Sequence, residues 1–254
     1  MIRMLWMLLV ALGLTLFWGP LVLFQALRGR KGGDWYVGVT RRWAGGVLRA
    51  SGAPVVIHGA EHIHPGEPQV IVANHVSWFE IFAIAATLPV PYHFVAKKEL
   101  LRIPVFGAAM RAAGHITIDR SNRERAIQSL REAGAKIRHD PAAVVIFPEG
   151  TRSRSGRLQP FKKGAFVLAA ESGVAIVPTA CTGSYEIMPP GALTIRPRPI
   201  HIHYLPPISP AEVAALSAAG PEPLMERVRG EMLTVLAPYE AALPPPKLPA
   251  GRPS

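Results

Sequence analysis

The sequence is poor in cysteine and in acidic side chains. Cys181 is the only cysteine among 254 residues, so the chain cannot form an intramolecular disulfide, which fits a reducing compartment. Asp and Glu number 17 against 28 Lys and Arg, which leaves a formal net charge of +11. Hydrophobic residues make up 49% of the chain, so intrinsic disorder is not the expected state. A chain of this length is expected to build one substantial core with an appended element.

Several familiar catalytic and cofactor-binding motifs are also missing. The chain has no G-x-S-x-G nucleophile elbow, no P-loop and no glycine fingerprint of dinucleotide-binding folds. Histidines alternate at His62-x-His64 and at His201-x-His203, and alternate residues of a strand share a face. Neither pair has an evident cysteine or acidic partner to complete a ligand set, so the sequence predicts no metal site.

The excess positive charge lies mainly in the middle of the chain. Between Lys97 and Lys163 there are fifteen Lys or Arg and six Asp or Glu, a net of +9. Such a field favours anionic partners, which include nucleic acid, an anionic membrane surface and phosphate-bearing substrates. Charge alone does not choose among them, so a basic binding protein without catalytic activity is an alternative to an enzyme.

The N-terminal segment Met4–Leu27 is almost unbroken apolar sequence. It is too long for a signal peptide and long enough for one membrane-spanning helix of about 20 residues. Gly19 and Pro20 would kink or break such a helix, which leaves a kinked span or a shorter helical pair in one leaflet, with a buried core helix as a third alternative. The basic cluster at residues 28–31 predicts that this end lies on the cytoplasmic side.

The next segment, Trp35–Ala50, has an amphipathic pattern with aromatic and basic side chains. Such a helix either lies in the membrane interface or packs as an ordinary surface helix. We therefore expect residues 1–52 to form a membrane anchor and interfacial helix, followed by a domain over 53–208. Two C-terminal helices are expected over 209–243, and residues 244–254 form a Pro-rich tail.

Within residues 53–208, short β-branched runs alternate with helix-like segments. This alternation predicts an α/β domain with a mostly parallel central sheet flanked by helices. The predicted strands are Val55–His58, Val70–Ala73, His93–Ala96, His115–Ile118, Ala143–Phe147, Val174–Thr179 and Ile200–Leu205. The predicted helices are Trp78–Leu88, Ile103–Ala113, Asn122–His139 and Lys163–Ser172, with Ala211–Ala219 and Pro223–Tyr239 beyond the domain.

Two residues that could form an acid–base pair follow the predicted strand Val70–Ala73. His75 and Glu80 are five positions apart, so on one regular helix they would point to different faces. They can meet if His75 lies in the strand-to-helix turn and Glu80 in the first helical turn. The carboxylate would then accept the Nδ1 proton and leave Nε2 free as a base. Ser77–Glu80 also matches a capping box, in which Glu80 folds back onto the backbone of Ser77, and the residues alone leave both interpretations open.

Further charged residues follow other predicted strands, at the sheet edge where α/β sites tend to lie. Beyond Ala143–Phe147, Gly150 permits close approach of the backbone to a ligand, and Arg152 offers a planar fork of donors that matches phosphate oxygens. Lys97 and Arg120 stand just past two other strands. A solvated basic loop is the structural alternative.

Taken in order, these blocks resemble the 1-acyl-sn-glycerol-3-phosphate acyltransferase family. His75 matches the histidine of the family's His-x-x-x-x-Asp block, with Glu80 in place of the usual Asp. Gly114–Arg120, Phe147–Ser153 and Ile176–Pro178 match the three later blocks, and the resemblance covers residues 54–206. The ordered blocks favour the catalytic pair over the cap. Glutamate is one methylene longer than aspartate and can still accept the imidazole proton, so we expect its role to survive the exchange.

The resemblance implies an enzyme that transfers a fatty acyl group from acyl-CoA or acyl carrier protein to the sn-2 hydroxyl of lysophosphatidate, which forms phosphatidate. It implies no metal, no bound cofactor and no nucleic acid, and it places the active site on the cytoplasmic face of the inner membrane, against an anionic surface. Another lysolipid, such as lyso-ornithine lipid or lysophosphatidylglycerol, or glycerol phosphate itself, is an alternative acceptor.

The same resemblance assigns roles to residues. His75 would be the general base and Glu80 its orienting carboxylate. Six further residues would bind the acceptor, the cations at its phosphate and the others along its glycerol part: Lys97, Arg120, Glu149, Gly150, Thr151 and Arg152.

Overall fold

The structure is a computed structural model that describes residues 1–30, 32–119, 128–134 and 142–244. Seven strands of the described part form one sheet in the order β1-β7-β6-β2-β5-β3-β4. Neighbouring strands are parallel except for β6 and β7, which are antiparallel. The strands are β1 (Val55–His58), β2 (Gln69–Ala73), β3 (Tyr92–Lys97), β4 (Ile116–Ile118), β5 (Ala143–Ile146), β6 (Ala175–Thr182) and β7 (Ile200–Tyr204). The predicted α/β architecture with a mostly parallel sheet is confirmed.

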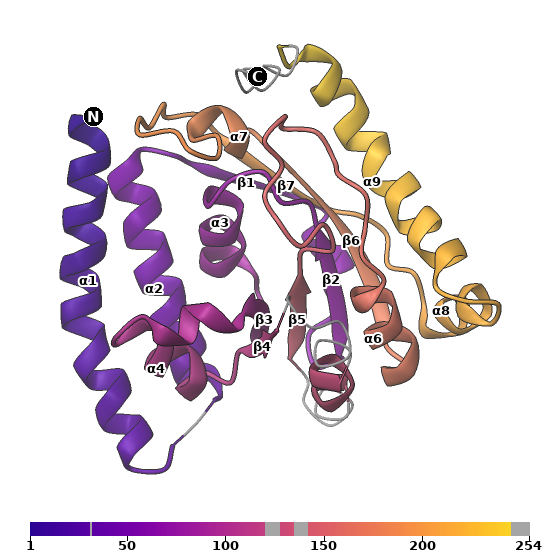
Figure 1. The fold of residues 1–254 in the computed structure, drawn as a ribbon, viewed down its shortest axis with the longest axis horizontal. Coiled ribbons are helices and arrows are strands. Elements are labelled where there is room, and N and C mark those ends of the chain that lie inside the picture. Colours follow the sequence, from indigo (N-terminus) through magenta and orange to yellow (C-terminus); the bar gives the residue numbers. More distant parts are fainter. Residues whose placement is uncertain (31, 120–127, 135–141, 245–254) are drawn as a thin grey trace, which may run out of the picture.

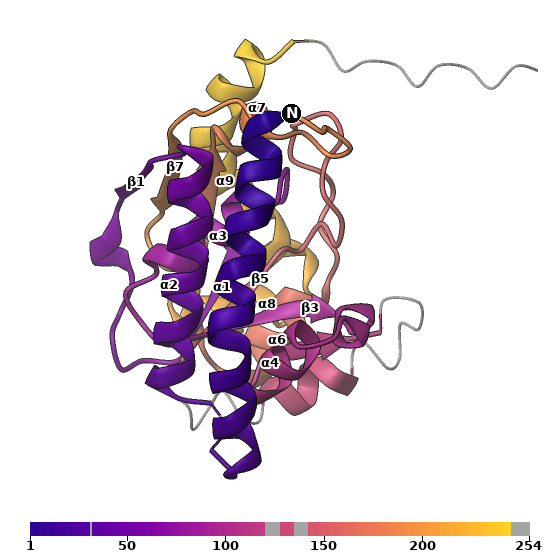
Figure 2. The same cartoon turned by 90° about the vertical axis from the view of Figure 1, so that its left-hand side faces the viewer.

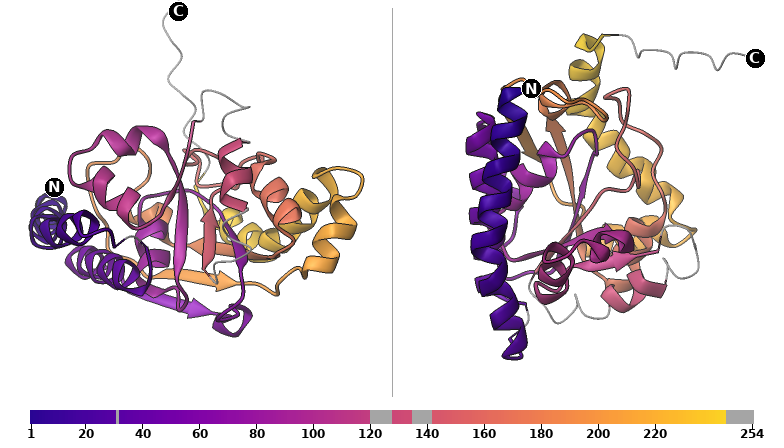
Figure 3. Two further views of the ribbon diagram at one scale, coloured as in Figure 1. Left: turned by 90° about the horizontal axis from the view of Figure 1, so that it is seen from below. Right: turned by 60° about the vertical axis from the view of Figure 1, so that its left-hand side comes forward.

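The central strands β2 and β5 are buried on both faces, which explains their continuous apolar runs. Alternate residues enter two hydrophobic clusters. Ile71 and Val145 point into the cluster on one face, whereas Val70 and Val144 point into the cluster on the other. The sheet therefore lies between two helical layers, as Figure 1 and Figure 3 show.

Most helices of the two halves of the chain cover opposite faces. The first cluster is completed by helices of the N-terminal half and by Ile187, and the second by residues 128–134 and the other helices of the C-terminal half. The N-terminal helices are α1 (Ile2–Leu27), α2 (Asp34–Ser51), α3 (Phe79–Thr87) and α4 (Phe106–Ala112), with short 3-10 turns η1 (Ala60–His62) and η2 (Lys98–Arg102). The later helices are α6 (Gly164–Ser172), α7 (Ser184–Ile187), α8 (Pro210–Ser217) and α9 (Glu222–Ala242).

Helix α1 is one continuous helix through Gly19 and Pro20, so the expectation of a shorter helical pair within this run is wrong. It lies alongside α2 on the outside of the molecule (Figure 2). It is long and apolar enough to cross a membrane, and only 17% of its most apolar stretch is buried within the protein. Large side chains such as Leu16 and Phe17 are more than 60% exposed. Such exposure is costly in water and points to association with a membrane.

Helix α2 packs on the body of the protein along one face. Val47 and Leu48 are buried, the indole N–H of Trp43 donates to Thr15 Oγ1 of α1 at 3.0 Å, and Arg41 donates to the carbonyl of Val90 at 3.0 Å. The interpretation as a packed helix is therefore confirmed for this face. The remaining exposed residues, including Trp35, are compatible with an interfacial location as well.

Most predicted elements are observed with shifted ends. Helix α4 begins at Phe106, three residues later than predicted, because the preceding residue Val105 has a φ of +63°, in the left-handed region, and therefore cannot belong to the helix. The short helix α7 was not predicted. Of the predicted helix Asn122–His139, residues 128–134 are helical, and the rest lies outside the described residues.

Candidate active site

The candidate site lies where several parallel strands end at the same edge of the sheet. β2 runs into the turn that carries His75, and its neighbour β5 runs into the turn that carries Glu149 and Arg152. β3, on the other side of β5, ends at Lys97. The parallel register therefore gathers residues from distant parts of the sequence at one edge, as α/β topology leads one to expect.

His75 and Glu80 are in contact. The Nδ1 atom of His75 lies 2.8 Å from Glu80 Oε1, with 11% of the imidazole side chain exposed and the carboxylate fully buried. The carboxylate accepts the Nδ1 proton, so the lone pair is on Nε2. The ring also stacks on Phe147, with the centroids 4.4 Å apart. These contacts fix the tautomer and the orientation of the imidazole, as predicted for a general base.

The Glu80 side chain also forms hydrogen bonds with the backbone of the turn. Its Oε1 accepts from the peptide N–H groups of Val76 and Ser77, both at 2.8 Å. The reciprocal half of a capping box is not formed among the described residues, because α3 is capped by Trp78 without a side-chain hydrogen bond, while the Ser77 hydroxyl donates to the carbonyl of Met188 at 2.7 Å. The two sequence interpretations are thus compatible, since one carboxylate oxygen orients the imidazole and holds the start of α3.

Glu149 is a buried carboxylate that joins the β2 and β5 turns. Its Oε1 accepts from the peptide N–H of His75 at 2.6 Å, and its Oε2 accepts from the backbone and side-chain N–H groups of Gln159 at 3.0 and 3.1 Å. Burial raises the pKa of Glu149 to about 7, against the opposing effect of these donors. The turn makes a second bond to the base, from the Ser153 N–H to the carbonyl of His75 at 2.7 Å.

Arg152 lies on an aromatic platform next to the base. The central carbon of its guanidinium is 4.5 Å from the centre of the Trp78 ring, a cation–π contact. Within the described part of the chain, its N–H groups have no hydrogen-bond or ion-pair partner, and the arginine is half-buried. Stacking fixes the plane of the guanidinium and leaves its donors available to an anion.

The neighbouring residues of the same turn shape its backbone. Gly150 has a φ of +74°, in the left-handed region, and a Cβ added there would come within 2.9 Å of the Lys162 side chain. Thr151 is exposed, and its carbonyl accepts from Gln159 Nε2 at 3.1 Å. Thr151 therefore lies on the exposed surface of the turn, whereas Gly150 is half-buried against Lys162.

The remaining predicted cations are placed only in part. Lys97 is exposed at the end of β3, on the same sheet edge as the turns of β2 and β5. The adjacent Lys98 forms an ion pair with Asp119, which follows β4. Arg120 lies outside the described residues.

Some residues of the site were not singled out by the sequence analysis. Asn74 joins β2 to β6 through paired bonds, from Nδ2 to the Cys181 carbonyl at 3.0 Å and from the Cys181 N–H to Oδ1 at 2.7 Å. Gln159 holds Glu149, and Trp78 supports Arg152. Asn74 and Trp78 lie inside the His75 block and could have been suspected, whereas only the fold brings Gln159 to the site.

A cavity of about 630 Å³ lies away from this site. Arg41, Arg42 and Arg49 of α2 line it together with Ala86 and Thr87 at the end of α3. His75 is not among its lining residues. Among the described residues, one group of side chains has the spacing to hold a metal ion, formed by histidines of β1 and β7, and it too lies outside the candidate site.

The chain is similar to known acyltransferases in sequence and in structure. A profile of the acyltransferase family matches residues 54–182, more than half of the chain and the whole region from β1 to β6. The 1-acyl-sn-glycerol-3-phosphate acyltransferase of Limnanthes douglasii is 42% identical over 163 residues, which cover 64% of this chain and 57% of that protein. The human 1-acyl-sn-glycerol-3-phosphate acyltransferase alpha is 35% identical over 189 residues, 72% of this chain and 64% of that protein. The chain thus covers less than two thirds of the length of these relatives.

A solved structure extends the likeness over the whole chain. The crystal structure of the 1-acyl-sn-glycerophosphate (LPA) acyltransferase PlsC from Thermotoga maritima superimposes with a TM-score of 0.79 at 25% identity, and the match covers 96% of this chain and 97% of that one. The likeness therefore includes the N-terminal helices and the C-terminal helices as well as the sheet. With the family profile, the relatives and the contact between His75 and Glu80 in agreement, the chain belongs to the acyltransferase family.

Proposed function

We propose that this protein transfers a fatty acyl group from an acyl thioester, acyl-CoA or acyl carrier protein, to the sn-2 hydroxyl of lysophosphatidate and so forms phosphatidate. The observation that carries the proposal is the contact of His75 Nδ1 with Glu80 at 2.8 Å, next to a stacked arginine with free donors. The names of the relatives support the same reaction and acceptor.

In this mechanism His75 is the general base. Its Nε2 takes the proton of the acceptor hydroxyl while the hydroxyl oxygen attacks the thioester carbonyl carbon. The ester bond forms, the carbon–sulfur bond breaks, and the proton passes from His75 to the leaving sulfur. Glu80 compensates the positive charge on the imidazolium during these steps, and general base catalysis of this kind is typically worth about 10²- to 10⁴-fold.

The acceptor's phosphate would bind to the cations at the same edge of the sheet. Arg152 has its donors available and its plane held by Trp78, which suits a bidentate contact with phosphate oxygens. Lys97 would add charge from the end of β3, and Arg120, which lies outside the described residues, is proposed to do the same. The exposed Thr151 and the half-buried Gly150 beside it would contact the glycerol part of the acceptor.

For Glu149 we propose a positioning role in place of direct substrate contact. Both of its carboxylate oxygens are already occupied by N–H donors of His75 and Gln159. Only 4% of the residue is exposed, so a substrate has little access to it. It would act through His75, by holding the backbone of the base against the turn that carries Arg152.

The membrane is proposed as the place of the reaction. Each methylene of an acyl chain resists transfer to water by about 0.8 kcal/mol, so an enzyme that works at the bilayer avoids extracting its lysolipid and its product. Helix α1 supplies an exposed apolar surface for such an attachment. We propose the inner membrane, with the site facing the cytoplasm and an anionic lipid surface, on the basis of the basic cluster that follows the apolar run.

The test is an acceptor panel with the purified full-length enzyme in lipid vesicles. Lysophosphatidate, lysophosphatidylglycerol, lyso-ornithine lipid and glycerol 3-phosphate would each be offered with acyl-CoA and with acyl carrier protein, beside His75→Ala. We expect phosphatidate formation to be the fastest reaction and to slow by about 10²- to 10⁴-fold in His75→Ala. A different preferred acceptor would replace lysophosphatidate but keep the chemistry. Transfer by His75→Ala at a rate close to that of the parent would overturn the mechanism.

A further inference from the structure

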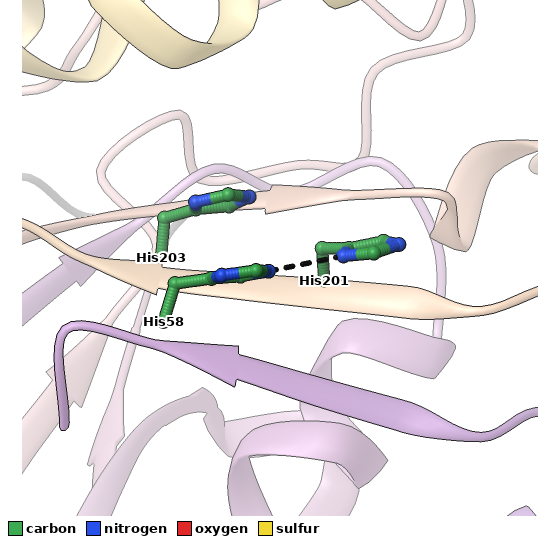
Figure 4. A group of neighbouring side chains, drawn as sticks. All are labelled: His58, His201 and His203. Atoms are coloured by element: carbon green, nitrogen blue, oxygen red, sulfur yellow. Dashed lines mark hydrogen bonds between the residues drawn. The ribbon is translucent and has the colours of Figure 1, made fainter.

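Three histidines form a compact group near one edge of the sheet, and β4 forms the other edge. His58 is the last residue of β1, the edge strand, and His201 and His203 lie on β7 beside it. One possible ligand nitrogen from each of the three lies within 4.8 Å of the other two. Figure 4 shows the three rings projecting from one face of the two strands, roughly parallel to one another.

The register of the sheet produces this grouping. β1 and β7 pair in parallel with His58 directly opposite His203, and His201 lies two residues earlier on the same face of β7. The alternate residues Ile200, Ile202 and Tyr204 point the other way, into the core. The imidazoles therefore project from the sheet face that is not packed against the N-terminal helices, where they are exposed or half-buried.

The distances suit coordination of a metal ion. His58 Nε2 lies 3.1 Å from His201 Nδ1, and two nitrogens on a tetrahedral zinc ion, each bonded at about 2.0–2.1 Å, would lie about 3.3 Å apart. The rings of His58 and His203 stack with their centroids 4.2 Å apart. Because the lone pairs lie in the ring planes, coordination by both residues requires one of these rings to rotate about its side-chain torsions. Three imidazoles leave a fourth position open to water.

The contact between His58 and His201 involves atoms that would bind the ion. It needs a hydrogen on one nitrogen and a lone pair on the other, so at least one of these two rings presents a lone pair to its neighbour. A metal ion in place of the shared hydrogen would be bound by a lone pair from each ring.

We propose that His58, His201 and His203 form a binding site for a divalent transition-metal ion of the zinc type. Neutral imidazole is a preferred ligand of such ions. The bound ion would link the edge strand β1, which follows the N-terminal helices directly, to β7 in the body of the sheet. This site is separate from the acyl-transfer chemistry, because β7 and β6 lie between β1 and the strand that leads to His75.

The test is titration of Zn²⁺ into the full-length protein, purified without a histidine tag and treated with a chelator. We expect one ion per chain, with three nitrogen ligands at about 2.0–2.1 Å by X-ray absorption. Loss of a partner that only orients a metal ligand costs about 10- to 100-fold in affinity, so His58→Gln, His201→Gln and His203→Gln should each cost at least about 100-fold. The exposed His64, which contacts Glu67 elsewhere on the surface, gives the matched control His64→Gln, whose affinity should equal that of the parent.

Two results would overturn the proposal. The first is an affinity that is unchanged in the variant lacking all three histidines, and the second is absence of Zn²⁺ binding by the parent chain. Because His58 is exposed at the sheet edge, its replacement leaves the core intact and separates loss of a ligand from loss of the fold. Acyl transfer by His58→Gln should stay within about twofold of the parent, as expected for distant sites, so failure of this site is distinguishable from failure of the proposed function.

Discussion

Two groups of imidazoles in this chain have contrasting surroundings. His75 is 9% exposed, bonded to a fully buried carboxylate and stacked on Phe147, whereas the histidines of β1 and β7 lie at the rim of the sheet and contact one another. A carboxylate on Nδ1 fixes the orientation of an imidazole and leaves it one defined lone pair, on Nε2. Neighbouring imidazoles without an acid leave several lone pairs that a cation can share. The same side chain is thus prepared for proton transfer in one place and for coordination in the other.

The largest expected effect is loss of the base. His75→Ala should lower kcat for acyl transfer by about 10²- to 10⁴-fold, the usual contribution of a general base. The matched change at the other group, His201→Gln, should leave kcat within about twofold. Both would be measured as phosphatidate formation from a radiolabelled thioester, with circular dichroism to show that each variant is folded. Equal losses in the two variants would erase the functional contrast between the groups.

The next effect comes from the carboxylate that distinguishes the two groups. Glu80→Gln keeps the shape but removes the negative charge that compensates the imidazolium, so we expect kcat to fall by about 10²-fold or more. Glu80→Asp keeps the charge and should retain part of the activity. Steady-state rates of both variants at saturating substrates would check this. If Glu80→Gln were as active as the parent, the role of Glu80 would be limited to accepting the backbone N–H groups of Val76 and Ser77.

Glu149 provides a prediction about pH. Burial raises its pKa from 4.5 to about 7 in the folded protein, which favours the protonated form. Its contribution to stability is therefore fully present below about pH 4.5 and is lost as the pH rises through about 7. The free energy of unfolding of the parent, relative to Glu149→Gln, should fall by about 3 kcal/mol across this window. Urea unfolding of both proteins at several pH values would measure it, and a difference that is flat or grows with pH would contradict the expectation.

The smallest effect is expected at the proposed phosphate contact. Arg152→Ala should raise KM for lysophosphatidate by about tenfold or more, because a charge-assisted hydrogen bond is worth about 1.5–3 kcal/mol, with a smaller change in kcat. The exposed neighbour Arg154 gives a matched control, since Arg154→Ala removes the same charge from the loop but not from the Trp78 platform. An equal rise in KM for both variants would attribute the effect to the general positive field, and an unchanged KM for Arg152→Ala would remove this residue from the phosphate site.

Much of the fold could be predicted because its signals are local. The continuous apolar runs of β2 and β5 follow from burial on both faces, and their alternation with helices indicated a parallel sheet. The course of α1 was harder, because a proline lowers helix stability without always interrupting a long apolar helix. The antiparallel pairing of β6 with β7 also could not be read locally, since register depends on which strands become neighbours.

The candidate site shows the same division. The residues alone left the contact of His75 with Glu80 open beside a capping box, and the ordered family blocks favoured it. The structure shows this contact at 2.8 Å. Glu149 was expected at substrate, yet its bonds to His75 and Gln159 depend on the pairing of distant segments. The same limit applies to His58 and His201, which are 143 positions apart in the sequence and meet only through the pairing of β1 with β7.

The bonds that tie both sides of the His75 backbone to the β5 turn have a consequence for redesign. The backbone N–H of His75 donates to Glu149, and its carbonyl accepts from the N–H of Ser153. The position of the base therefore depends on the loop that also carries Arg152. If this loop were exchanged for that of a relative to alter acceptor choice, the hydrogen bonds that hold the His75 backbone would change as well. Grafts should therefore carry residues 149–159 as one unit, so that Gln159 travels with the glutamate it supports.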